Sequence, residues 1–236
     1  MSTTARLYWE DAYQSEFAAT VLASADGWCA LSATAFYPGG GGQPADTGVL
    51  VTESAEGPVS GIRSQDGLLW HHTPLALTTG QRVIGRLDWP RRYQLMKYHT
   101  LLHIVNTVML DTHGALITGA DIGVAQARID FDVDAPLREA SAAVEAAVNA
   151  VIARSLALVA AFVPEEELTR NPRLVRTLEV APPVDHGRVR TLQITGFDTQ
   201  ACGGTHVHST AELGRCRITR VDNKGKRNKR LYVVLD

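Results

Sequence analysis

Residues 88–110 read DWPRRYQLMKYHTLLHIVNTVML, and this stretch separates two kinds of sequence. From residue 91 to residue 110 it contains neither glycine nor proline. Its apolar residues recur at helical spacing: Leu95, Leu102, Val105 and Met109. Asp88 and Pro90 just upstream are residue types that favour the start of a helix. The stretch therefore predicts a helix over residues 91–110.

The sequence before this helix has the pattern of short strands. Apolar runs alternate with glycine-containing turns, which is typical of small β-barrels and sandwiches. The runs cover residues 21–23, 28–34, 48–51, 67–72 and 83–87. We therefore predict an all-β N-terminal domain over residues 1–90, either a small barrel or a sandwich.

The sequence after the helix mixes both kinds of element. A second helix is expected to begin at Pro136, and a short one at Pro164. Strands are expected at residues 156–163, 188–195, 215–221 and 231–235. The pattern predicts an α+β domain over residues 91–236, and hence a two-domain protein.

Composition limits the class of protein. The chain has 236 residues, of which 45% are hydrophobic, enough for one large core or two modest ones. Three cysteines, an odd number, argue against a disulfide-stapled secreted scaffold and fit a reducing compartment. No apolar stretch approaches the ~20 residues that a membrane-spanning helix needs. We expect a soluble, cytoplasmic protein with no membrane segment.

Two pairs of residues suggest a metal site. His99 and His103 lie four residues apart on the predicted helix, which places both imidazoles on one face. Alone, this spacing is equally consistent with an exposed polar stripe. Cys202 and His206 flank a Gly-Gly turn, and the glycines let both side chains face one point. One cysteine and three histidines form a ligand set that suits Zn²⁺.

The ligand pattern leaves alternatives open. Four protein ligands are typical of a structural zinc, whereas a catalytic zinc keeps one position free. Cys202 would otherwise be a small buried hydrophobe. His208 competes with His206 as a ligand and ranks second because it lies outside the tight turn. The remaining histidines have no comparable partners and are expected at the surface or in the core: His71, His72, His113 and His186.

A glycine-rich motif occupies residues 34–48, which read TAFYPGGGGQPADTG. It lacks the Lys-Ser/Thr ending of a phosphate-binding P-loop, so we expect no nucleotide cofactor. One interpretation is a tight turn whose glycines supply positive φ angles. The other is a turn that packs against the second domain and shapes the entrance of a site there.

These motifs, together with a basic loop at residues 223–228, resemble the free-standing alanyl-tRNA editing proteins (AlaX) and the corresponding region of alanyl-tRNA synthetase. The resemblance covers almost the whole chain, and the motifs occur in the same order. It implies an N-terminal glycine-motif barrel joined to a zinc-binding editing domain, with Zn²⁺ held by His99, His103, Cys202 and His206. Threonyl-tRNA synthetases have an editing domain with a similar His/Cys pattern, but the glycine motif favours the alanyl branch.

The resemblance also implies an activity, the hydrolysis of mischarged tRNA(Ala). The chief expected substrate is Ser-tRNA(Ala), with Gly-tRNA(Ala) as a further candidate. No synthetase catalytic domain fits within 236 residues, so editing would occur in trans. Editing needs a polar group that recognises serine, because an apolar pocket rejects an added hydroxyl only weakly. Thr118 aligns with a serine-sensing threonine of the family, although it could equally be a turn threonine before Gly119.

Binding of tRNA requires positive charge, which the net charge of −2 conceals. Residues 1–90 carry 4 basic and 9 acidic side chains, whereas residues 91–236 carry 19 and 16. Residues 215–230 include eight basic residues and one acidic residue, Asp222, which gives this segment a local charge of +7. This run is either a solvated hairpin or a phosphate-binding face. The residues expected to contact substrate or tRNA are Gly41, Gln43, Asp46, Lys224, Lys226, Arg227 and Lys229.

Two other classes of function compete with editing. One is a non-catalytic RNA-binding module with a structural zinc, which the closed ligand set favours. The other is a metallohydrolase that acts on another small ester or amide, against which the basic hairpin argues.

Overall fold

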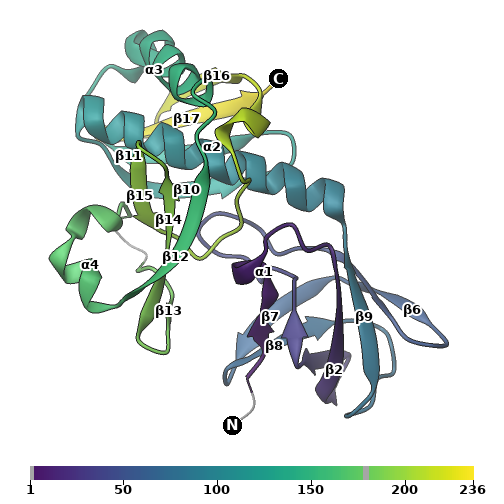
Figure 1. Ribbon diagram of the computed structural model, residues 1–236. Helices are drawn as coiled ribbons and strands as arrows, with labels where there is room; N and C mark the ends of the chain where they lie inside the picture. Colours follow the sequence, from purple (N-terminus) through teal and green to yellow (C-terminus); the bar gives the residue numbers. More distant parts are fainter. Residues whose placement is uncertain (1–2, 178–180) are drawn as a thin grey trace. The chain divides into compact units, whose positions relative to one another are not determined.

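The computed structural model describes residues 3–177 and 181–236 (Figure 1). The described chain is mostly β with few helices, and it divides into two compact units. Unit 1 comprises residues 1–40 and 44–94, and unit 2 comprises residues 41–43 and 95–236. The division falls inside helix α2 (Trp89–His113) and assigns three residues of the glycine motif to unit 2. The predicted domains 1–90 and 91–236 stay a prediction.

Unit 1 is built on a seven-stranded antiparallel sheet in the order β6-β5-β9-β2-β3-β8-β7. Its strands are β2 (Glu16–Ala25), β3 (Trp28–Leu31), β5 (Gly48–Val51), β6 (Glu56–Val59), β7 (Gly61–Gln65), β8 (Leu68–His72) and β9 (Arg82–Leu87). Helix α1 (Leu7–Glu10) and the parallel pair β1 (Ala5–Arg6) and β4 (Ala33–Thr34) complete the unit. Within the described ladders β6 and β7 are the two ends of the sheet, so a closed barrel is not confirmed.

Helix α2 follows from its local sequence. The Asp88 carboxylate accepts a hydrogen bond of 3.3 Å from the Arg91 N–H, which satisfies a free donor at the helix start. The helix ends at His113, before Gly114 at a φ of 62°. From Leu95 to Met109 every residue except Lys97 is buried. Because the helix is buried on all sides, polar side chains along it face the interior of unit 2.

The part of unit 2 that the structure describes forms two sheets. The first has the order β10-β11-β17-β16, formed by β10 (Leu116–Ile122), β11 (Ala127–Asp132), β16 (Cys216–Asn223) and β17 (Asn228–Leu235). The second joins β12 (Leu158–Pro164), β13 (Val184–Asp185), β14 (Arg188–Ile194) and β15 (Asp198–Ala201). Its central strand is β14, which pairs with the other three.

Helices cover and connect these sheets. Helix α3 (Leu137–Ile152) lies beside β16, as Figure 1 shows. Its Asn149 side chain donates to the Cys216 carbonyl and accepts from the Cys216 N–H, each at 2.9 Å, and Glu145 accepts from the Ile218 N–H at 2.7 Å. The helix thereby satisfies backbone groups of an edge strand. The other helices are α4 (Glu166–Arg170), η1 (Pro172–Leu174) and η2 (Thr210–Leu213).

The sequence predicted many of these elements. The expected helix over 91–110 lies within α2, and the strand over 48–51 matches β5. The short helix expected from Pro164 begins two residues later, at Glu166. Strands β10 and β11 were not predicted. None of the described helices is long and apolar enough to span a membrane.

Candidate metal centre and substrate site

The four predicted metal ligands come together in unit 2. Helix α2 supplies His99 and His103, and the loop after β15 supplies Cys202 and His206. One donor atom from each residue lies within 4.8 Å of all the others. The Cys202 Sγ is 3.5 Å from His99 Nε2 and 3.2 Å from His206 Nε2. His208, the second-ranked candidate, lies outside this group and donates its backbone N–H to Glu212.

These four residues fit a zinc ion. With Zn–S near 2.3 Å and Zn–N near 2.0 Å, the S···N edge of a coordination tetrahedron is about 3.5 Å, close to the two observed separations. All three imidazoles are buried, and Cys202 is partly buried. One thiol and three ring nitrogens are also the donor types that zinc prefers. We call these residues, His99, His103, Cys202 and His206, the metal cluster.

Burial sets the protonation of the metal cluster. Desolvation lowers the pKa of His99 and of His206 well below the ordinary value, and it lowers the pKa of His103 to about 4. The neighbouring imidazoles and the cation of Arg190 lower the pKa of His99 and of His206 further. Desolvation raises the pKa of the Cys202 thiol. The histidines are therefore neutral and keep a lone pair for a metal, whereas the thiol must lose its proton on binding.

A buried arginine holds the loop that carries two of the ligands. Arg190 on β14 is 5% exposed, and its Nη1 donates to the carbonyls of Cys202 (3.0 Å) and Gly204 (2.9 Å). The Cys202 N–H donates in return to the Arg190 carbonyl at 2.9 Å. The alternation of the sequence did not predict that Arg190 is buried. Arg190 lies two residues after Arg188 on β14, so both would be expected on the same face, yet Arg188 is exposed.

The glycine motif contributes directly to unit 2 through residues 41–43. Gln43 is 2% exposed, and its Oε1 lies 2.7 Å from His99 Nδ1. The Gln43 amide also bonds to the backbone and to the hydroxyl of Thr205. Gln43 therefore contacts a metal ligand, a role that the sequence did not predict for it.

The same segment packs against strand β10. The Gly42 carbonyl accepts a 2.9 Å hydrogen bond from the Ile122 N–H. A Cβ on Gly42 would lie 2.8 Å from the Ala120 carbonyl oxygen, and its φ of 86° also favours glycine. This close approach explains the glycine at position 42, and it places the segment between β10 and the metal cluster. Gly41 precedes it at a φ of 60°, with no neighbour within 4 Å of an added Cβ.

Thr118 occupies an irregularity in β10. The pairing of β10 with β11 shifts between Ile117 and Gly119, so Thr118 is the extra residue of a β-bulge. Its Oγ1 is buried and has no hydrogen-bond partner among the described residues. A buried hydroxyl without a partner is uncommon in proteins, and this one keeps its capacity to form a hydrogen bond.

Asp46, which was expected to contact substrate or tRNA, lies in the interior of unit 1. Its carboxylate is buried in unit 1 and forms an ion pair of 2.5 Å with Arg92, which is also fully buried. It also accepts the Tyr37 N–H at 2.6 Å. The Arg92 guanidinium further donates to the carbonyls of Ala12 and Ala35. These bonds give Asp46 a structural role in the interior of unit 1.

Most basic side chains of the β16–β17 hairpin are paired. Arg227 bonds to Asp132 (2.7 Å) and Arg230 to Asp130 (2.6 Å), and both acids lie on β11. The other ion pairs join Arg217 to Asp236, and Arg220 and Lys224 to Asp222. Lys229 is 9% exposed and donates to the Gly225 carbonyl within the hairpin. Lys226 is exposed and has no ion pair among the described residues.

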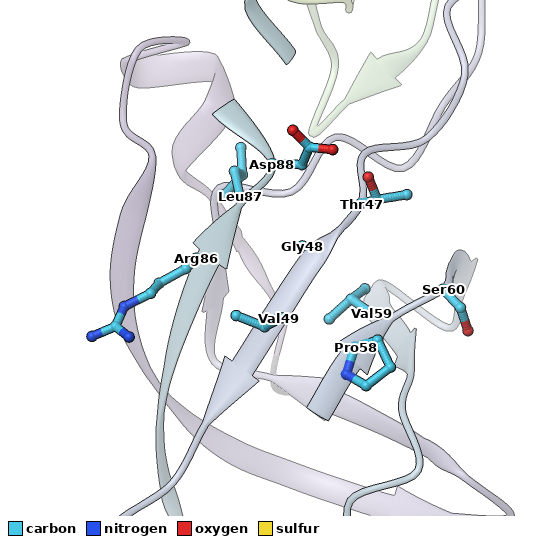
Figure 2. Close-up of a pocket in the computed structure, with 9 residues that line it drawn as sticks. All are labelled: Thr47, Gly48, Val49, Pro58, Val59, Ser60, Arg86, Leu87 and Asp88. Atoms are coloured by element: carbon cyan, nitrogen blue, oxygen red, sulfur yellow. The ribbon is translucent and has the colours of Figure 1, made fainter. Parts of the chain in front are cut away.

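The other histidines lie outside the metal cluster. His71 is fully buried and pairs with Thr34, whereas His72 is exposed and bonds to Ser60. A hollow of about 560 Å³ in unit 1 is lined by nine residues. Figure 2 draws these residues, which are Thr47, Gly48, Val49, Pro58, Val59, Ser60, Arg86, Leu87 and Asp88. Its charged members include Arg86, which pairs with Glu16. The hollow contains none of the predicted site residues.

Two family models match the chain. The second additional domain of threonyl and alanyl tRNA synthetases matches residues 189–232, which include Cys202 and His206. The model of class II (A) tRNA synthetases matches residues 6–91. Two separate parts of the chain are thus similar to parts of tRNA synthetases.

Full-length relatives identify the family. The alanyl-tRNA editing protein AlaX-M of Methanosarcina barkeri is 38% identical over 98% of this chain and 99% of the relative. AlaX-M of Saccharolobus solfataricus is also 38% identical, with the same coverage. The alanine–tRNA ligase of Pyrobaculum neutrophilum is 36% identical over 93% of this chain but only 25% of the ligase. The chain belongs to the AlaX family of alanyl-tRNA editing proteins.

Proposed function

We propose that this protein is a hydrolase that removes the wrong amino acid from mischarged tRNA(Ala) in trans, with Ser-tRNA(Ala) as its chief substrate. Gly-tRNA(Ala) is the second candidate. The observation that carries the proposal is the convergence of four metal-ligand side chains within 4.8 Å in unit 2 of a member of the AlaX family. The bond to be broken is an aminoacyl ester, and its hydrolysis requires no protein nucleophile.

The metal cluster would hold one Zn²⁺ through His99, His103, Cys202 and His206. When bound, zinc supplies a Lewis acid for an ester carbonyl or for a water molecule. The protein's own contribution is to keep the imidazoles neutral by burial and to hold the Cys202 loop in place through Arg190. The dry surroundings also strengthen the interaction of these groups with a charged reaction centre.

Thr118 supports recognition of serine. Its buried hydroxyl has no protein partner among the described residues, so the hydroxyl of a seryl group would satisfy it. Alanine has no hydroxyl and would leave the threonine oxygen unpaired in the complex. Leaving a buried polar group unpaired costs about 1–3 kcal/mol, which corresponds to roughly 5- to 150-fold discrimination.

Binding of tRNA is proposed for the exposed tip of the β16–β17 hairpin. Lys224, Lys226 and Arg227 are exposed there, and Lys226 has no ion pair within the described residues. Phosphate contacts from such residues supply affinity that depends on salt. Asp46 and Lys229 are engaged inside their units, so they do not enter this proposal.

A single-turnover assay with a Thr118→Val variant tests the function and its specificity together. The substrates are Ser-tRNA(Ala), Ala-tRNA(Ala) and a small serine ester. The unmodified protein should deacylate Ser-tRNA(Ala) selectively, and Thr118→Val should lower the serine-to-alanine rate ratio by about 10-fold or more. Thr195→Val, at an exposed threonine of the same unit, is the matched control and should keep the ratio.

Three outcomes would contradict the proposal in different ways. An unchanged ratio in Thr118→Val removes Thr118 from serine recognition. No turnover of any substrate supports an RNA-binding module with a structural metal. Turnover of the small ester alone supports a general metallohydrolase.

A further inference from the structure

The amide of Gln43 forms three hydrogen bonds around the metal cluster. Its Oε1 lies 2.7 Å from His99 Nδ1 and 3.2 Å from the backbone N of Thr205. Its Nε2 lies 2.8 Å from Thr205 Oγ1. All these residues belong to unit 2, although Gln43 lies 162 positions from Thr205 in the sequence.

These contacts fix the orientation of the amide. The Thr205 backbone N–H can only donate, so the Gln43 atom that faces it must be the oxygen. The same oxygen faces His99 Nδ1, which must therefore carry the ring proton and donate it. The proton on Nδ1 leaves a lone pair on Nε2, the atom 3.5 Å from Cys202 Sγ.

The surrounding residues restrict the movement of the Gln43 and His99 side chains. Gln43 is 2% exposed and His99 is 6% exposed, so water does not compete easily for their hydrogen bond. Gly204 closes the other side of the pair. A Cβ on Gly204 would lie 2.6 Å from His99 Nδ1 and 3.1 Å from Gln43 Oε1.

We infer that Gln43 is a positioning residue for the metal cluster, selecting the His99 tautomer and ring orientation that present Nε2 to a metal ion. Outer hydrogen-bond partners of metal-bound histidines act in this way in many metal sites. The inference rests on the metal cluster of the proposed function but does not depend on the identity of the substrate. It gives the glycine motif a purpose, because the close packing of Gly42 on β10 brings Gln43 to His99.

Three substitutions separate this role from a general effect on folding. Gln43→Met has a similar length but no acceptor, so we expect zinc affinity to fall by about 10- to 100-fold. Gln43→Glu keeps an acceptor for both N–H groups, so its affinity should stay within about 3-fold of the unmodified protein or increase. Gln193→Met, at an exposed position on β14, is the matched control.

The test is a competition between each protein and a chromophoric chelator for Zn²⁺, with far-UV circular dichroism to confirm folding. The visible spectrum of the Co²⁺-loaded proteins provides a second readout, which should change in Gln43→Met and be retained in Gln43→Glu. Equal zinc affinity in the unmodified protein and folded Gln43→Met would overturn the inference alone. If the unmodified protein takes up no zinc, the proposed metal centre and the inference both fail.

Discussion

Two polar regions of unit 2 differ in whether their polar groups are already paired within the protein. The metal cluster is buried and neutral in charge before a metal binds, with its imidazoles deprotonated by desolvation. The β10-β11-β17-β16 sheet carries arginines and aspartates that are paired within and across its strands. The first region is arranged to receive a cation, whereas the second has already satisfied most of its charges internally.

This difference shows which sequence patterns predict features of the folded structure. The spacing of His99 and His103 depends only on helix geometry, so folding preserved it. The local charge of +7 in the hairpin counted only neighbours in sequence and omitted Asp130 and Asp132, which β11 brings opposite Arg230 and Arg227. A motif based on geometry is therefore more reliable here than a count of charges.

Removing a ligand from the metal cluster should have the largest effect. Cys202→Ala deletes the only sulfur donor, so we expect zinc affinity and deacylation of Ser-tRNA(Ala) each to fall at least about 100-fold. Cys216→Ala removes another buried thiol of unit 2 and should leave zinc affinity unchanged. Equal zinc content of the two purified variants, measured by atomic absorption, would mean that Cys202 is not a ligand.

A buried histidine outside the metal cluster tests whether desolvation alone keeps imidazoles neutral. Burial lowers the pKa of His71 to about 4. In the unfolded chain the value is near 6.5, so between these pH values the unfolded state binds more protons. Stability should therefore fall as the pH drops from about 6.5 to 4, by at most about 1.4 kcal/mol per pH unit from this residue.

His71→Gln should remove this part of the pH dependence, as measured by urea unfolding at several pH values. His72→Gln, at the exposed neighbouring position, should retain it. Identical pH profiles for the two variants would contradict the role of His71.

Smaller and opposite effects are expected on the charged face. Asp132→Asn frees Arg227, so tRNA affinity should rise a few-fold and the slope of log K against log salt should steepen by about 0.9. Lys226→Gln removes a charge that has no ion pair among the described residues, so it should reduce affinity and slope by similar amounts. Filter binding over a salt series measures both. Unchanged slopes in both variants would mean that the hairpin does not contact phosphates.

The sequence predicted the elements whose patterns are local. Helix α2 has a start signal at Asp88 and a regular apolar period, and both were visible. Strand β10 was missed because the bulge at Thr118 and the following Gly119 interrupt its alternation. Strand β11 was also missed, although its residues alternate regularly between apolar and charged types. The pattern of short strands and turns left a barrel and a sandwich open, because strand pairing at the ends of a sheet is a long-range property that such patterns do not determine.

The candidate site was predicted only where its residues belong to local sequence motifs. The four metal ligands belong to two short motifs, and the spacing within each motif brings two ligand side chains close together. Arg190 and the Gln43–His99 contact depend on which segments pack together, so no local pattern predicted them. Asp46 belonged to a recognisable motif, yet its buried ion pair with Arg92 became visible only in the fold.

The most direct test measures serine release from Ser-tRNA(Ala) in a single turnover by protein stripped of metal and shown to be folded by circular dichroism. We predict that the rate falls at least about 100-fold and returns when one equivalent of Zn²⁺ is added. An undiminished rate in the folded, metal-free protein would contradict a catalytic role for the metal cluster.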